Sequence, residues 1–135
     1  MTDHRTAPDL ATTTDAGVVT VRCTGELDLD STPGLRNALL GPIRAGARGV
    51  VVDLTGTTFC DSAVFSVLLE AHRDAGARGV PYAIAAGEAA VARPLQFLGL
   101  DRLLPLYPGP AAARAAVARK PVANGDAPGP SAVLN

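Results

Sequence analysis

The sequence predicts an α/β domain with a mostly parallel or mixed β-sheet. Residues 50–54 form a continuous, largely β-branched run, which is typical of a strand buried on both faces. From Ser62 onward the apolar residues recur at helical spacing, as Val64, Leu68 and Ala71 show. Strand and helix patterns alternate along the chain, and 135 residues is the usual size of one domain.

The first half of the predicted domain contains a strand, a helix and the buried strand. Alternating apolar side chains predict the first strand at Val19, Val21 and Cys23. We expect a helix to begin near Thr32, which offers a capping oxygen, with Pro33 in its first turn. Pro42 blocks a backbone hydrogen bond, so this helix is expected to end or kink there.

The second half is predicted to begin with the helix from Ser62, closed by Gly76 and Gly79. The elements expected after it are a strand at 82–85, a short helix at 91–98 disturbed by Pro94, a last strand at 103–106 and a helix at 111–119.

The two ends of the chain differ from the middle. The first dozen or so residues lack apolar alternation, and residues 121–135 are rich in Pro, Gly and Ala. We therefore expect a flexible N-terminus at 1–9, a domain at 10–119 and a disordered tail at 120–135. Residues 1–15 lack the apolar core of a secretory signal, and no apolar run is long enough to span a membrane, so we expect a cytoplasmic protein without membrane insertion.

Charge and cysteine content exclude several classes of protein. Twelve basic and thirteen acidic residues give a net charge of −1, which argues against direct nucleic-acid binding through general basicity. Cys23 and Cys60 lie in apolar stretches and form no metal-binding motif. We expect both thiols to be buried and reduced, and we expect neither a metal site nor a cofactor.

Asp61 and Ser62 form the most informative pair in the sequence. The buried strand is predicted to run through a short loop that ends in these residues, at the N-terminus of the next helix. Helix capping alone would explain them. The same position would also suit a phosphate on Ser62, because free N–H groups and the helix dipole stabilise an anion there.

The sequence offers weak grounds for a catalytic site. A Ser–His hydrolase would need a base near Ser62, but His72 lies ten residues along the same predicted helix, about 15 Å away. Glu26 and Asp28 could be drawn as the carboxylate pair of a glycosidase, although they are also what an acidic turn after a strand would contain. No nucleotide-binding glycine motif is present. We expect no catalytic residues and no enzyme.

Four motifs in order resemble the STAS domain of bacterial anti-sigma factor antagonists. They are Gly25-Glu26-Leu27-Asp28, Val51-Val52-Asp53-Leu54, Phe59-Cys60-Asp61-Ser62 and Gly99-Leu100-Asp101-Arg102-Leu103. The resemblance covers roughly residues 10–119. It implies a mixed sheet with helices packed mainly on one face.

The resemblance also implies a function. Such domains bind an anti-sigma factor that is a serine kinase and release a sigma factor; the kinase phosphorylates the motif serine, here Ser62, and a serine phosphatase restores binding. Asp28, Asp61, Ser62, Val64 and Phe65 would form the partner-binding region. Val64 stands where the family usually has glycine, which would add bulk where a partner's backbone approaches. The alternative is an adaptor that binds a non-kinase partner, such as a transporter or a stress-signalling complex.

Overall fold

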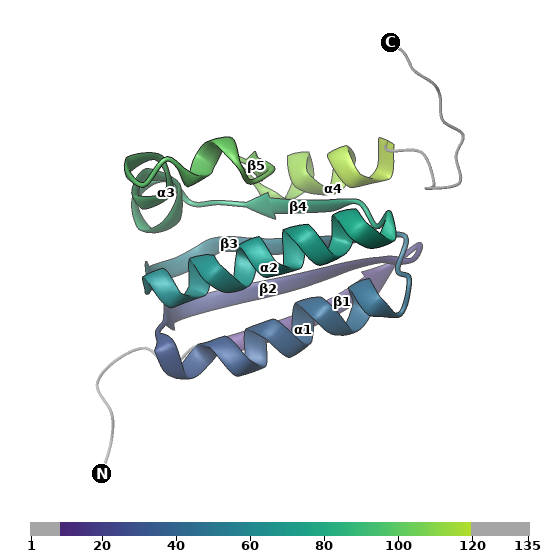
Figure 1. The fold of residues 1–135 in the computed structure, drawn as a ribbon, viewed down its shortest axis with the longest axis horizontal. Helices are drawn as coiled ribbons and strands as arrows, with labels where there is room; N and C mark the ends of the chain where they lie inside the picture. Colours follow the sequence, from purple (N-terminus) through teal and green to yellow (C-terminus); the bar gives the residue numbers. More distant parts are fainter. Residues whose placement is uncertain (1–8, 120–135) are drawn as a thin grey trace.

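One mixed sheet forms the centre of the protein (Figure 1), and helices lie on both of its faces. The computed structural model describes residues 9–119. The strands are β1 (Asp9–Asp15), β2 (Val18–Leu27), β3 (Gly49–Cys60), β4 (Tyr82–Ala85) and β5 (Leu106–Tyr107). They lie in the order β1-β2-β3-β4-β5; β1 is antiparallel to β2, and each further pair is parallel.

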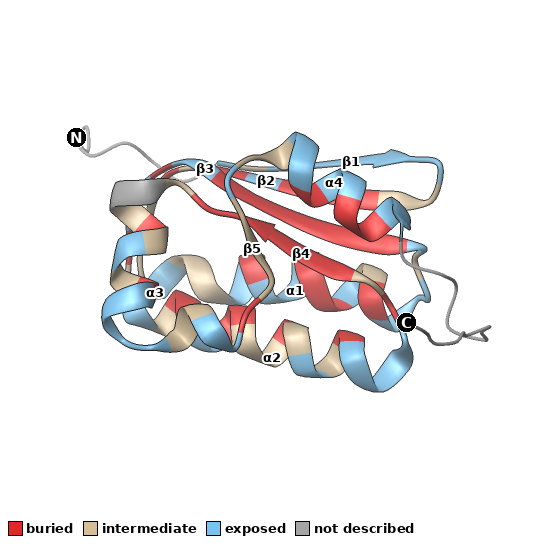
Figure 2. Cartoon of the chain, turned by 90° about the horizontal axis from the view of Figure 1, so that it is seen from above, coloured by how far each residue is buried: buried red, intermediate tan, exposed pale blue. Residues whose placement is uncertain are grey.

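The helices divide unequally between the two faces of the sheet. They are α1 (Thr32–Arg44), α2 (Ser62–Arg78), α3 (Arg93–Phe97) and α4 (Pro110–Arg119). Two 3₁₀ turns, Leu29–Ser31 and Leu100–Arg102, and a π-helical turn, Glu88–Ala92, complete the described elements. Figure 2 shows α4 on the opposite side of the sheet from α1 and α2. The prediction of a mixed sheet with helices mainly on one face is confirmed, and α4 is the exception.

Two apolar clusters hold these layers together. The larger one lies between the sheet and the α1–α2 layer, and its fully buried members include Leu27, Leu39, Val52, Leu68 and Ile84. The smaller cluster lies under α4 and contains Val51, Ala83, Ala85, Ala113 and Val117. Residues 50–54 are buried throughout, as the β-branched run predicts, because β3 has helices on both sides.

The strand β1 is not predicted by the sequence analysis. Six of its seven residues are exposed, so its sequence shows no alternation of apolar and polar side chains. Threonine favours extended structure, and Thr12, Thr13 and Thr14 pair with Val21, Thr20 and Val19 of β2. Apart from Asp9, where β1 begins, the predicted flexible N-terminus (1–9) and disordered tail (120–135) lie outside the described residues.

The strands β2 and β3 are longer than predicted. The expected loop after Leu54 is wrong, because β3 continues to Cys60. The expected acidic turn at 25–28 is also wrong: Gly25 (φ +87°) lies within β2, next to a shift in its pairing with β3. Four residues of this part of β3 are exposed because β4 pairs only with residues 50–53. Because these residues are exposed, their sequence lacks the apolar pattern of a buried strand and predicts a loop.

The helix ends depart from the sequence predictions in smaller ways. Pro42 does not end α1, which continues to Arg44 with the proline inside the helix. Thr32 does not cap α1; its hydroxyl donates to the carbonyl of Leu29 (2.8 Å). Gly76 lies inside α2, and the helix ends at Gly79 in the left-handed conformation. The last strand begins at Leu106 rather than 103.

Both cysteines are free and buried, as the sequence analysis expects. Burial, with smaller contributions from the charges of Cys60 and Asp53, raises the pKa of the Cys23 thiol to about 12. Burial and the nearby Asp61 raise the pKa of Cys60 to about 12. At neutral pH both thiols are therefore protonated and act as small apolar side chains.

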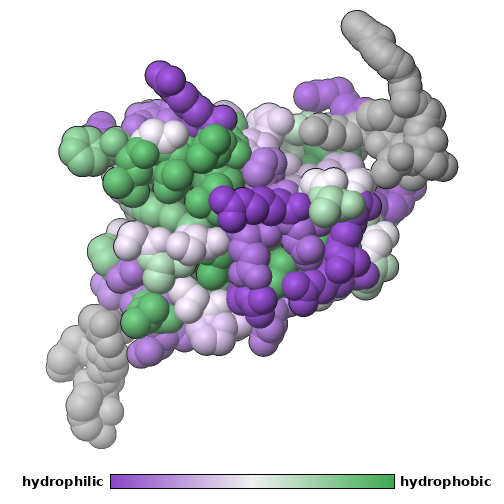
Figure 3. Space-filling model, in the orientation of Figure 1, coloured by the Kyte–Doolittle hydropathy of each residue, from purple (hydrophilic) through white to green (hydrophobic). Residues whose placement is uncertain are grey.

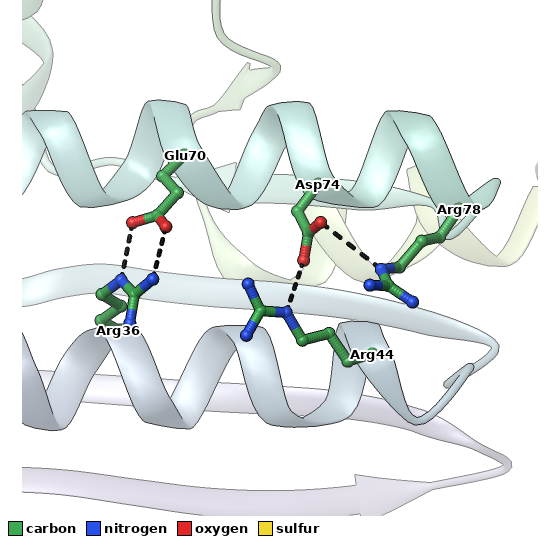
Figure 4. Close-up of polar contacts among 5 residues, drawn as sticks. All are labelled: Arg36, Arg44, Glu70, Asp74 and Arg78. Atoms are coloured by element: carbon green, nitrogen blue, oxygen red, sulfur yellow. Dashed lines mark hydrogen bonds and ion pairs between the residues drawn. The ribbon is translucent and has the colours of Figure 1, made fainter.

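Charged side chains connect α1 to α2 on the outer face of the helical layer. Figure 3 shows hydrophilic side chains over much of this face. In the close-up of Figure 4, Arg36 donates two hydrogen bonds to Glu70, at 2.8 and 2.7 Å. Asp74 accepts from Arg44 (3.1 Å) and from Arg78 (3.4 Å). These pairs are exposed, so they add less to stability than the apolar contact beneath them.

Removing a core side chain of α2 tests the packing. Leu68 is fully buried. Leu68→Ala is expected to lower the free energy of unfolding by about 2–5 kcal/mol through lost burial and a residual cavity. Urea denaturation measures the change. Ser66→Ala is the matched control, because Ser66 is exposed on the same helix, and it should change stability by less than about 0.5 kcal/mol. Equal effects of the two substitutions would contradict the packing.

The Arg36–Glu70 pair should make stability depend on pH. The hydrogen bond from Arg36 holds the pKa of Glu70 below its ordinary value of 4.5. A lowered pKa in the folded state contributes stability above the unfolded pKa, and this contribution is lost as the pH falls through the folded pKa. Wild type should therefore be more stable than Glu70→Gln at pH 7, and the difference should shrink at an acid pH below the ordinary pKa of 4.5. Urea titrations at both pH values measure it, and a larger difference at the acid pH would contradict the assignment.

Candidate functional site

The candidate site lies at the edge of the sheet where the parallel strands β2 and β3 end. Leu27 pairs with Cys60 at the last position of both strands. Directly afterwards, the backbone N–H of Asp61 donates to the carbonyl of Leu27 (2.8 Å). Asp28 and Asp61, the residues that directly follow the two strands, therefore lie together at this edge. The structure thus brings together two residues 33 positions apart that the sequence analysis placed in one partner-binding region.

Asp61 forms the N-cap of α2. Its backbone is extended (φ −67°, ψ 149°), and its Oδ1 accepts a hydrogen bond from the N–H of Ala63 at 2.8 Å. The carbonyl of Asp61 accepts from the N–H of Val64 at 2.9 Å. The capping interpretation is confirmed, and it fixes the direction in which the 17-residue helix leaves the strand.

Ser62 is the first residue of α2 and is exposed. Its hydroxyl forms no hydrogen bond with any residue of the described part of the chain. It is therefore presented to solvent on the end of a rigid element, next to the Asp61 carboxylate. The hydroxyl is therefore accessible without unfolding of any part of the helix.

Asp28 closes a second cap beside the first. Its Oδ1 accepts from the N–H (3.2 Å) and the hydroxyl (3.0 Å) of Ser31, while its own N–H donates to the Ser31 hydroxyl (3.2 Å). This reciprocal capping box orders the 3₁₀ turn Leu29–Ser31, which contacts α2. Asp30 is exposed on the same turn. The edge near Ser62 thus carries the carboxylates of Asp28, Asp30 and Asp61.

Val64 and Phe65 are placed in the core instead of on the site's surface. Val64 is fully buried and Phe65 is 4% exposed, and both pack in the larger apolar cluster. The helical turn directs them toward the sheet while Ser62 and Ser66 face outward. A partner docked on this edge would therefore contact neither side chain, which corrects the expectation of bulk at Val64. Both residues act on the site only by anchoring α2.

Exposed apolar side chains near this edge are not identified by the sequence analysis. Leu29 is 65% exposed between Asp28 and Asp30, and Phe59 is 50% exposed near the end of β3. Phe97 on α3 is 91% exposed. Figure 3 shows hydrophobic side chains gathered over the α3 region. Leu29 stands alone between two aspartates, and that pattern is the one sequence signal that could have indicated an exposed leucine.

The geometry does not assemble the alternative catalytic sites. Helix α2 is continuous, so His72 lies about 15 Å along its axis from Ser62. Asp28, one of the two carboxylates considered for a glycosidase, forms the capping box with Ser31, and the other, Glu26, lies in β2. Within residues 9–119 there is no cluster of three His, Cys, Asp or Glu side chains suited to a metal ion. No helix in the same range is long and apolar enough to cross a bilayer.

Comparison with known proteins identifies one family. A family model described as the STAS domain matches residues 9–113. No curated protein matches the chain significantly.

Several solved structures are similar in fold. An anti-sigma factor antagonist from Mycobacterium paratuberculosis is 27% identical, with 83% of this chain and 95% of that chain covered and a TM-score of 0.76. An anti-sigma-factor antagonist (STAS) domain protein from Planctomyces limnophilus is 17% identical over 81% and 97% of the two chains, with a TM-score of 0.68. The Bacillus cell fate determinant SpoIIAA in its phosphorylated form is 21% identical over 81% and 98%, with a TM-score of 0.62.

The Asp61 cap makes a prediction about stability. Asp61→Ala should lower the free energy of unfolding by about 1 kcal/mol, because the N–H of Ala63 loses its acceptor at the start of α2. Asp61→Asn is the control, since an amide oxygen can accept the same hydrogen bond, and it should retain most of the stability. Chemical denaturation measures both variants. If Asp61→Ala were as stable as wild type, the cap would not be the residue's structural role.

Proposed function

The chain belongs to the STAS-domain family, and from this membership we propose that it acts as an anti-sigma factor antagonist. It binds an anti-sigma factor that is a serine kinase and so releases a sigma factor. The kinase phosphorylates Ser62, the phosphorylated form no longer binds, and a serine phosphatase restores the active form. In this proposal the protein works in the cytoplasm as a binding module, without catalysis, a cofactor or direct contact with nucleic acid.

The observation that carries the proposal is the position of Ser62. Its hydroxyl is exposed at the first residue of a 17-residue helix that Asp61 caps. A phosphate there would remain in solvent and would not require the core to rearrange. The helix dipole would favour the added charge, whereas the nearby carboxylates of Asp28 and Asp61 would oppose it. These opposing effects leave the fold largely unchanged, so the modification would act on binding.

The proposed switch is electrostatic. A phosphoserine carries about −1.5 to −2 charges and three acceptor oxygens. The whole chain has a net charge of −1, and the edge near Ser62 is already acidic. A partner that fits the small serine hydroxyl and the exposed apolar side chains Leu29 and Phe59 would have to desolvate or repel the phosphate. A penalty of about 3 kcal/mol would weaken binding by roughly two orders of magnitude.

The residues after Ser62 differ from the usual family pattern, and the burial of Val64 supports kinase access. Val64 replaces the usual glycine but is fully buried, so its extra volume lies in the core and not on the surface that a partner approaches. Ala63 removes a second hydroxyl beside Ser62. Ser62 is then the hydroxyl that the Asp-Ser motif offers to a kinase.

Among the solved relatives, the Mycobacterium paratuberculosis protein is an anti-sigma factor antagonist. Its likeness to this chain extends over most of both proteins, which favours the same role here. Bacillus SpoIIAA has been solved in a phosphorylated form, so this fold accommodates phosphorylation in that protein.

An adaptor role with a non-kinase partner is the second candidate. The observation that favours it is the exposed apolar surface of α3 and the turn that follows, with Phe97, Leu98 and Leu103 more than half exposed. A partner docked there would not need to contact Ser62. Affinity capture with mass spectrometry separates the two functions, because it identifies the partner and the modification state of Ser62 in one sample.

Substitutions at Ser62 test the proposed switch. The wild type and Ser62→Ala should capture the same anti-sigma factor, while Ser62→Asp should bind it roughly a hundredfold more weakly, because it places a carboxylate at the contact. Isothermal titration calorimetry with the captured partner measures the affinities. The melting temperatures of the three proteins should be similar, since Ser62 is exposed.

The matched control is Ser66→Asp, which adds the same charge to an exposed position one turn along α2. It should weaken binding by less than Ser62→Asp does if the partner contacts the N-terminal end of the helix. Equal affinities for Ser62→Ala and Ser62→Asp would contradict the switch. Equal losses for Ser62→Asp and Ser66→Asp would show a general charge effect without a site at Ser62.

A further inference from the structure

A polar cavity lies on the sheet face opposite the α1–α2 layer. It has a volume of about 470 Å³, within the range of small-molecule sites. Its walls come from β1, β2, β3 and α4. Helix α4 packs over β3 and β4, and the exposed face of β1 and β2 continues beside it. The cavity lies between the side of α4 and the part of the sheet that α4 leaves uncovered.

Asp53 and Thr20 form the buried part of this cavity. Asp53 is 6% exposed and Thr20 is 9% exposed. The Asp53 Oδ1 accepts hydrogen bonds from the N–H (3.0 Å) and the hydroxyl (2.6 Å) of Thr55. The other carboxylate oxygen of Asp53 and the hydroxyl of Thr20 have no hydrogen-bond partner among the described residues. Among the described residues, every side-chain oxygen or nitrogen that is completely buried has a hydrogen-bond partner. Since these two groups have none, they are accessible, and they face the cavity that they line.

Two arginines line the same cavity. Arg22 lies on β2, opposite Asp53 in the strand register, and Arg114 projects from α4. Both are exposed, and neither forms an ion pair with a residue in the range 9–119. Arg36, Arg44 and Arg78, by contrast, are paired with carboxylates. The cavity thus holds two unpaired guanidinium groups beside a buried carboxylate.

We propose that this cavity binds a small hydroxylated anion of the sugar-phosphate class. Arg22 and Arg114 bind the anionic group, for which planar guanidinium donors are well suited. The accessible oxygen of Asp53 accepts a hydrogen bond from a ligand hydroxyl, and the Thr20 hydroxyl can donate to or accept from a second one. The site is independent of the proposed switch, because Ser62 belongs to the helical layer on the other face of the sheet.

The chemistry of the cavity disfavours other classes of ligand. A metal cation would find one carboxylate beside two positive charges. An apolar ligand would leave charged groups unpaired at the walls. A bare inorganic anion would satisfy the arginines but would leave the free oxygen of Asp53 without a donor and close to a like charge. A ligand that carries both an anion and hydroxyl groups satisfies all four side chains.

Calorimetric titration with ribose 5-phosphate tests the proposal on the full chain. Saturable binding is expected in wild type, and the affinity should fall about tenfold or more in Arg114→Gln, which loses a charge-assisted hydrogen bond. Inorganic phosphate and ribose should each bind at least tenfold more weakly than the combined ligand. Arg119→Gln is the matched control, because Arg119 is exposed on the same helix and does not line the cavity.

Several outcomes would overturn the site. One is the absence of saturable binding of ribose 5-phosphate at about 10 mM. Another is an equal loss of affinity in Arg114→Gln and Arg119→Gln. The third is equal affinity for ribose 5-phosphate and inorganic phosphate, which would indicate an adventitious ion only. Thermal melts without ligand check that both variants remain folded. The titration uses neither Ser62 nor the anti-sigma factor, so its failure leaves the proposed antagonist function standing, and the reverse also holds.

Discussion

The parallel pairing of β2 with β3 is the constraint on which the candidate site depends. It extends to the last residue of both strands, Leu27 and Cys60, and the hydrogen bond from Asp61 to the carbonyl of Leu27 continues it by one residue. This pairing places the two capped turns side by side, one closed by Asp28 and the other by Asp61. Ser62 is then exposed at the end of a rigid helix, and the buried face of α2 holds that helix in place.

The parts of the protein predicted well from the sequence are those in which local chemistry and tertiary structure agree. Residues 50–54 are β-branched and buried on both faces, so the run identified the central strand. Asp61 has a capping side chain directly before an apolar helical pattern, and it caps α2. The family motifs supplied what spacing alone could not, namely that Asp28 and Ser62 belong to one region.

The parts that the sequence did not predict depend on contacts between distant segments. The strand β1 and the end of β3 are exposed, so they lack alternation, and their conformation comes from pairing with β2. Val64 belongs to the apolar helical stripe that the spacing identifies, and its burial follows that stripe and not the partner-binding surface that the family resemblance implies. The polar cavity combines side chains from four separated elements, of which Arg22 and Arg114 individually look like ordinary solvated residues.

In the proposed function, one phosphate on Ser62 controls binding. The most direct measurement is to incubate the complex of this protein with its captured anti-sigma factor and ATP, and to follow complex dissociation and phosphosite occupancy by mass spectrometry in the same samples. We expect phosphate to appear on Ser62 and the complex to dissociate in proportion to the occupancy of that site. Phosphate at another residue, or a complex that persists with Ser62 fully phosphorylated, would contradict it.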